Sequence, residues 1–83
     1  MRYKVRLTVE ESRCREGTVK TGDSFIVDEL CPPLCMELWH AAYPYVFALG
    51  NGASLDEEED RSLRFRVRCP DGGRVVLLGE REE

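Results

Sequence analysis

The pattern of apolar and polar side chains predicts two strands at the start of the chain. Residues 2–10 alternate strictly, with apolar side chains on one face and charged or hydroxyl side chains on the other. A period of two over this length is typical of a half-buried strand. Turn-forming glycines follow at positions 17 and 22, and residues 24–29 predict a second, shorter strand.

Residues 34–49 have the period of a helix. Turning by about 100° per residue places one broad apolar stripe toward a sheet, made of Leu34, Cys35, Leu38, Ala41, Ala42, Tyr45, Val46 and Leu49. Pro32 and Pro33 suit a helix start, and Gly50 suits its end. Pro44 removes a backbone hydrogen bond and crowds the preceding turn, so we expect a kink or a break of the helical segment near Tyr43.

The last third of the chain predicts two more strands. Residues 53–62 are acidic and predict a solvated connection, after which residues 62–69 alternate again. The sequence Asp-Gly-Gly at 71–73 predicts a tight turn into a strand over residues 74–80. The expected structure is one α+β domain over residues 1–83, of order ββαββ. An antiparallel four-stranded sheet is covered on one face by the broken helical segment.

Composition and charge narrow the class of protein. A chain of 83 residues is too short to divide its apolar side chains between two cores. The net charge of −4 gives no general attraction to nucleic acid or to an anionic membrane. No apolar stretch is long enough to cross a bilayer, and the first residues lack the apolar core of a signal peptide. We therefore expect a cytoplasmic protein that binds neither membrane nor nucleic acid.

Basic side chains are concentrated on the outward positions of two predicted strands. If those strands are neighbours, half of the basic residues share one sheet face: Arg2, Lys4, Arg6, Arg64, Arg66 and Arg68. A sheet that binds RNA normally adds exposed aromatic rings for base stacking. Tyr3 and Phe65 have inward parity instead, so a solvated face balanced by glutamates is the preferred interpretation.

Four cysteines are the strongest candidates for chemistry: Cys14, Cys31, Cys35 and Cys69. Thiolates bind soft metals, and zinc or an iron–sulfur cluster usually takes four ligands. The chain has no C-x-x-C pair, however, and cysteine is also among the most buried residue types. Metal ligation and simple burial both remain open, with the sulfurs of Cys14, Cys35 and Cys69 expected close together in the first case.

A thiol redox role centred on Cys35 is the third interpretation. The start of a helix favours the thiolate form, and Cys31 is the candidate resolving partner. The spacing differs from that of thioredoxin-type sites. His40, the single histidine, does not share a helix face with Cys35, and no nucleophile–base motif or phosphate-binding loop is present. Enzyme chemistry is therefore not favoured.

The helix carries a second apolar stripe on the side opposite the sheet. Met36, Tyr43 and Phe47 lie there, with His40 between them. One helix cannot bury both sides against one sheet. We expect either a homo-oligomer that covers Met36, Tyr43 and Phe47, or a repacking of this stripe at the Pro44 break.

Three motifs together resemble a family of small bacterial and archaeal proteins with no assigned function. They are C-x7-G-D-x-F from Cys14, C-x7-Y-P-Y-V-x-A-L from Cys35, and C-P-D-G from Cys69. The resemblance covers residues 14–80 and implies that these three cysteines and the Tyr43-Pro44 helix break are shared features. Family members often have P-x-G before the middle cysteine, so Cys31 looks like an addition. Many also have a histidine near the position of Thr18, where this chain lacks one.

The leading hypothesis is a small protein whose cysteines bind zinc or an iron–sulfur cluster within a homo-oligomer. The alternative is a non-catalytic protein-interaction module with buried structural cysteines, acting through the outer stripe of the helix. A thiol redox protein is the third hypothesis.

Overall fold

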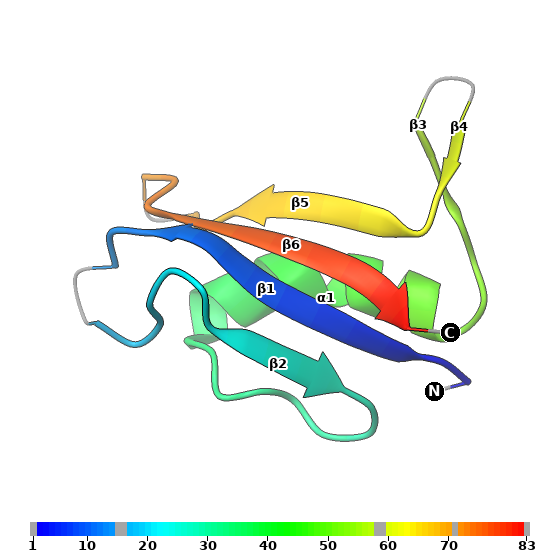
Figure 1. Ribbon diagram of the computed structural model, residues 1–83, viewed down its shortest axis with the longest axis horizontal. Coiled ribbons are helices and arrows are strands. Elements are labelled where there is room, and N and C mark those ends of the chain that lie inside the picture. The colour runs from blue at the N-terminus through cyan, green and yellow to red at the C-terminus, as the bar shows by residue number, and fades with distance from the viewer. Residues whose placement is uncertain (1, 15–16, 58–59, 71, 83) are drawn as a thin grey trace.

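A four-stranded antiparallel sheet with one helix on one face forms the body of the protein (Figure 1). The computed structural model describes residues 2–14, 17–57, 60–70 and 72–82. The strands are β1 (Lys4–Ser12), β2 (Ser24–Val27), β5 (Arg64–Arg68) and β6 (Val75–Glu82), and the helix is α1 (Met36–Gly50). The predicted α+β class and the ββαββ order of these main elements are confirmed.

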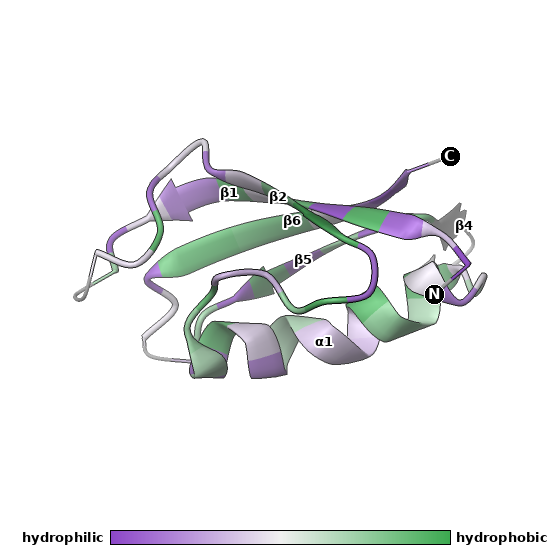
Figure 2. Cartoon of the chain, turned by 90° about the horizontal axis from the view of Figure 1, so that it is seen from below, coloured by the Kyte–Doolittle hydropathy of each residue, from purple (hydrophilic) through white to green (hydrophobic). Residues whose placement is uncertain are grey.

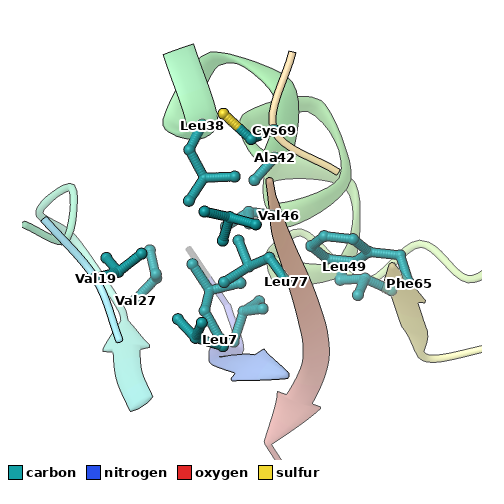
Figure 3. Close-up of a cluster of buried hydrophobic side chains, with 13 residues drawn as sticks. Leu7, Val19, Val27, Leu38, Ala42, Val46, Leu49, Phe65, Cys69 and Leu77 are labelled. Carbon is teal, nitrogen blue, oxygen red and sulfur yellow. The ribbon is translucent and has the colours of Figure 1, made fainter. Parts of the chain in front are cut away.

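The core lies between the sheet and α1, as Figure 2 shows from the side. Alternation along β1 turns Val5, Leu7 and Val9 toward the helix, and all three are buried. Four fully buried helix residues at helical spacing meet them (Figure 3): Leu38, Ala42, Val46 and Leu49. Burying each large aliphatic side chain contributes about 1.5–3 kcal/mol, so this layer is the main source of stability.

The missing side chain of Gly79 allows an aromatic ring to lie on the sheet. Gly79 pairs with Phe65 across the strands, and a Cβ at Gly79 would lie 2.2 Å from two ring carbons of Phe65. Tyr45 stacks on the Phe65 ring, with centroids 5.2 Å apart and planes inclined by 24°. Tyr45 was expected in the core, but it is half exposed and closes the core's edge.

The expected break at Pro44 is wrong, because α1 is one continuous helix from Met36 to Gly50. Pro44 cannot donate the hydrogen bond that the His40 carbonyl would otherwise accept. Both residues are exposed, so water can solvate that carbonyl. The helix also begins two residues later than expected, with Cys35 as its N-cap and both prolines before it.

The acidic connection is also different from expectation, because it contains a second, two-stranded sheet. Strands β3 (Leu55–Glu57) and β4 (Asp60–Ser62) pair antiparallel, with Leu55 opposite Ser62. Leu55 packs against the main core and so attaches the hairpin to it. The many charged residues of this segment predicted a solvated connection, and the single apolar residue Leu55 did not indicate that the segment would pack against the core. Leu63, which was expected to point inward, is exposed between β4 and β5.

Strand order decides whether the two strands with basic outward positions are neighbours. The order β2-β1-β6-β5 places β6 between β1 and β5, so the two strands with basic outward positions are not neighbours. Register places Glu80 of β6 between Arg6 of β1 and Arg64 of β5. Acidic side chains therefore lie between the two rows of basic ones.

Candidate interaction surface

Three of the four cysteines are at one end of the fold, where β1 and β5 finish and α1 begins (Figures 1 and 2). Cys69 follows β5 directly and is part of the buried core, while Cys14 and Cys35 are half-buried and pack against that core. Cys31 is exposed and lines a groove beside the helix instead. The fold therefore separates Cys31 from the core-facing position of Cys35.

The sulfur of Cys35 caps the start of α1. Its Sγ accepts a hydrogen bond from the Leu38 N–H at 3.4 Å, which satisfies one of the unpaired donors in the first helical turn. Within the described residues, no three His, Cys, Asp or Glu side chains are placed to hold a metal ion together. Zinc or cluster binding by Cys14, Cys31, Cys35 and Cys69 stays a prediction that metal analysis of the purified protein would test.

The outer face of α1 presents a row of three aromatic rings, which we call the aromatic row: Trp39, Tyr43 and Phe47. They are spaced four residues apart and therefore lie one above another on the helix surface. Ring centroids are 5.4 Å apart between Trp39 and Tyr43, and 5.9 Å apart between Tyr43 and Phe47. Tyr43 is 49% exposed, Phe47 47% and nearby Met36 83%. These three residues were expected on the helix side that the sheet cannot cover, and the structure leaves them exposed there; whether a second subunit covers them stays a prediction.

A groove of about 300 Å³ runs beside the aromatic row. Its helix side is the aromatic row with Val46 and Asn51, and its other side is the end of β2 and residues 28–31, which follow β2. Val27, Leu30 and Cys31 contribute apolar surface from that second side, and Leu30 is almost fully exposed. Two separate parts of the chain thus build one apolar hollow that is open to solvent.

The groove is acidic at the end that lies near the C-terminus of α1. Asp28 and Glu29 line it there together with Asn51, and none of the described lining residues carries a positive charge. The last turn of α1 has no basic residue, but a guanidinium nitrogen of Arg2 lies beside Gly52, just beyond the end of the helix. Asn51 caps this end, its side-chain amide donating to the Phe47 carbonyl at 2.8 Å. The groove is therefore an apolar hollow with acidic residues at one end.

Sequence reasoning identified part of this surface and missed the rest. Tyr43 and Phe47 were recognised, but Trp39 was not assigned to the outer stripe, although the spacing W-x3-Y-x3-F is visible in the sequence. Leu30, Asp28 and Glu29 were missed because they lie outside the helix. Nothing in their spacing indicates that the segment passes beside the helix, since that position depends on tertiary packing.

The sheet face that points away from α1 is a network of opposite charges. Arg6 pairs with Glu82, and Arg66 donates to both carboxylate oxygens of Glu10 across β6, at 2.7 and 3.2 Å. The hydrogen bond from Arg66 holds the pKa of the Glu10 carboxyl below its ordinary value, and the carboxylate raises the pKa of Arg66. Absence of nucleic-acid binding stays a prediction for this face.

A wider hollow of about 570 Å³ lies where β1 begins and β6 ends. Basic side chains from both strands and Glu82 line it around Tyr3. The guanidinium of Arg81 lies 4.3 Å from the Tyr3 ring centroid, and Glu82 pairs with Arg6. These charges already contact groups within the protein, so this hollow is less suited to a ligand than the groove beside α1.

Comparison of the chain with protein-family models, with curated proteins and with solved structures gives no match. The family resemblance based on Cys14, Cys35 and Cys69 therefore stays a prediction. No helix in the described part of the chain has the length and apolar character needed to cross a membrane.

Proposed function

We propose that this protein is a non-catalytic interaction module that binds another protein through the outer face of α1. The observation that carries the proposal is the aromatic row, in which Tyr43 and Phe47 are half exposed, beside an open apolar groove. Tyrosine, tryptophan and phenylalanine are enriched at the centres of protein interfaces, because they bury a large area and lose few rotamers on binding.

The inner face of α1 supports the same proposal. Its four core residues are fully buried, and of the aromatic row only Trp39 packs against this core. The fold therefore does not require large apolar side chains at positions 43 and 47, where polar residues would improve solubility. Binding to another protein explains the large apolar side chains at these two positions, whereas folding does not require them.

Self-association through Met36, Tyr43 and Phe47 concerns this same face and stays a prediction, as does a cytoplasmic location. Sedimentation velocity over a range of concentrations measures the oligomeric state directly. Comparison of the wild type with the double variant Tyr43→Ala/Phe47→Ala shows whether any oligomer uses this face.

The proposal is tested by cross-linking the tagged protein in its own cells and comparing what it captures. Tyr43→Ala/Phe47→Ala removes most of the exposed aromatic area, and Ile26→Ala, on the far face of the sheet, is the matched control. We expect the double variant to lose a specific partner that Ile26→Ala retains, and to bind that purified partner at least about tenfold more weakly, a loss of about 1.4 kcal/mol. Equal capture and equal affinity for all three proteins would refute the proposal.

A further inference from the structure

We propose that the outer edge of β5 binds an extended segment of a partner protein, which adds to the sheet as a further strand and places an acidic side chain beside Arg68. β5 is the outermost strand on its side of the sheet, and no strand in the described part of the chain pairs with its outer edge (Figure 1). This edge is separate from the outer face of α1, so it can bind a partner whether or not that face does.

Hydrogen bonds at both ends of β5 determine which of its backbone groups face outward. The Cys69 N–H and the Leu63 carbonyl both bond to β6, at 2.9 and 3.0 Å, and the register between them runs without a shift. Backbone groups alternate in direction along an antiparallel strand, so those of Arg66 and Arg68 point away from β6. A row of alternating N–H and C=O groups is matched by the backbone of another extended segment.

The usual obstacles to strand addition are missing along β5. It contains no proline, and its pairing with β6 has no bulge that would twist the edge away. The Arg66 side chain reaches back across β6 to Glu10, at 2.7 Å. The Arg68 side chain lies beside Gly73, where a Cβ would be 3.6 Å from the Arg68 Cδ. Both arginine side chains therefore lean toward β6 and the turn before it, and away from the outer edge.

Side chains beside the edge indicate the chemistry of the added strand. Arg68 is exposed and makes no ion pair with any residue that the structure describes. On the helix side of the sheet, Val67 is half-buried, and Tyr45, which stacks on Phe65, is 42% exposed. Side chains alternate between the two faces of a strand. A segment of alternating acidic and apolar residues can therefore pair with Arg68 on one face and cover Val67 and Tyr45 on the other.

A second copy of β5 is a poorer occupant than an acidic segment. The residues whose backbone groups face the edge are all arginines, at positions 64, 66 and 68. When two copies of β5 pair antiparallel, arginine therefore lies opposite arginine, and like charges directly opposite each other are destabilising. Parallel pairing through the same edge turns one sheet over, so the arginines of one copy lie beside the apolar face of the other.

Amide hydrogen exchange measures the edge directly. In the free protein we expect the amides of Arg66 and Arg68 to exchange rapidly, and those of Phe65 and Val67 slowly, because only the latter bond to β6. The probes are four synthetic peptides of eight residues. The first alternates glutamate and valine. The second is N-methylated on its glutamates, whose N–H groups would face β5, and the third on its valines, whose N–H groups would face away. The fourth has lysine in place of glutamate.

We expect the glutamate–valine peptide to bind with a dissociation constant below about 1 mM and to slow exchange at Arg66 and Arg68. Methylation of the glutamate N–H groups should weaken binding at least about tenfold, whereas methylation of the valine N–H groups should change it by less than about twofold. The lysine peptide should bind at least about fivefold more weakly than the first.

Variants of Arg68 separate the backbone contribution from the charge. Arg68→Pro removes one outward N–H without removing a bond to β6, and should weaken binding about tenfold. Arg68→Glu keeps the N–H and should prefer the lysine peptide to the glutamate peptide, which tests the charge even if the proline variant does not fold. Lys20→Glu is the matched control, since Lys20 is exposed in the connection before β2, at the opposite edge of the sheet, and should leave the affinities unchanged.

Three results would overturn the inference. The first is exchange at Arg66 and Arg68 that stays rapid with every peptide at millimolar concentration. The second is equal binding of the two N-methylated peptides, which would show that the backbone edge is not the site. The third is slow exchange at these amides in the free protein that becomes rapid on dilution, which would make a second copy the occupant. The capture experiment with Tyr43→Ala/Phe47→Ala judges the outer face of α1 separately.

Discussion

The two faces of α1 both carry apolar side chains, but the inner face is buried and the outer face is partly exposed to solvent. On the inner face Leu38, Ala42, Val46 and Leu49 have no solvent exposure, because the sheet covers them completely. On the outer face, the same 15-residue helix carries Trp39, Tyr43 and Phe47, of which the last two remain half exposed. Apolar character therefore does not by itself place a side chain in the core.

What separates the two faces is the number of surfaces available to cover them. The described part of the chain has one main sheet and one helix, so only one side of the helix is packed against strands of that sheet. Residues 28–31 lie beside the other side but leave an open groove. We expect stability to depend on the inner face and binding to depend on the outer one, and four measurements test that division.

Truncation of the inner face should have the largest effect. Leu49→Ala removes a fully buried side chain and should lower the free energy of unfolding by about 2–5 kcal/mol, through lost burial and the cavity that remains. Urea titration followed by circular dichroism measures this change. Leu49→Met keeps most of the volume and should cost less than about 1.5 kcal/mol. If Leu49→Ala lowered the free energy of unfolding by less than about 1.5 kcal/mol, the inner face would not be the main source of stability.

Adding one methyl group beneath Phe65 should have the next largest effect. Gly79→Ala places a Cβ where the buried Phe65 ring lies, and Tyr45 limits how far that ring can move. We expect a loss of about 1–3 kcal/mol from overpacking, measured by the same titration. The double variant Gly79→Ala/Phe65→Leu tests the cause. Its loss should be smaller than the sum of the two single losses, because the shorter side chain removes the clash; simple additivity would contradict this explanation.

Truncation of the outer face should change stability little. Phe47→Ala loses one ring contact with Tyr43, but alanine has the higher helix propensity, and we expect a net change within about 1 kcal/mol. Thermal unfolding of Phe47→Ala and of Leu49→Ala compares the stability lost at two positions within a single turn of α1. If Phe47→Ala were as destabilising as Leu49→Ala, the aromatic row would belong to the folding core and the proposed interaction surface would lose its main support.

The smallest effect should come from the exposed ion pair on the far face of the sheet. Arg66 lowers the pKa of Glu10 in the folded state, so the pair stabilises the fold above the ordinary pKa of glutamate, about 4.3. This contribution disappears as the pH falls through the lower folded-state value. Glu10→Gln should be slightly less stable than the wild type at neutral pH and should match it in strong acid. A difference that persists in acid would assign the effect to packing rather than to charge.

Particular residues show how far the sequence predicts this site. Tyr43 and Phe47 were expected on an uncovered helix face, since the helical period alone determines which side chains share a face. Trp39 belongs to the same spacing and was overlooked. Asp28, Glu29 and Leu30 were beyond prediction, because a segment without a regular period carries no signal for the surface it will contact.

The cysteines show the same limit. The inward position of Cys69 followed from strand parity, and the core-facing side of Cys35 followed from helical phase. The Cys35 sulfur caps α1 because the helix begins at Met36. The two preceding prolines had predicted a helix start two residues earlier. Whether Cys14, Cys35 and Cys69 bind a metal together depends on distances between segments that no local pattern specifies.

The sequence by itself determined the four main strands, the helix and the two apolar faces of that helix, because each is a repeating local pattern of two or about 3.6 residues. Only the tertiary structure decided that β6 lies between β1 and β5, that an acidic connection forms a hairpin, and that residues 28–31 form a groove with α1. These outcomes depend on contacts between residues far apart in the chain. Such contacts form where apolar area can be buried and charges can be paired, and the period of one segment does not contain that information.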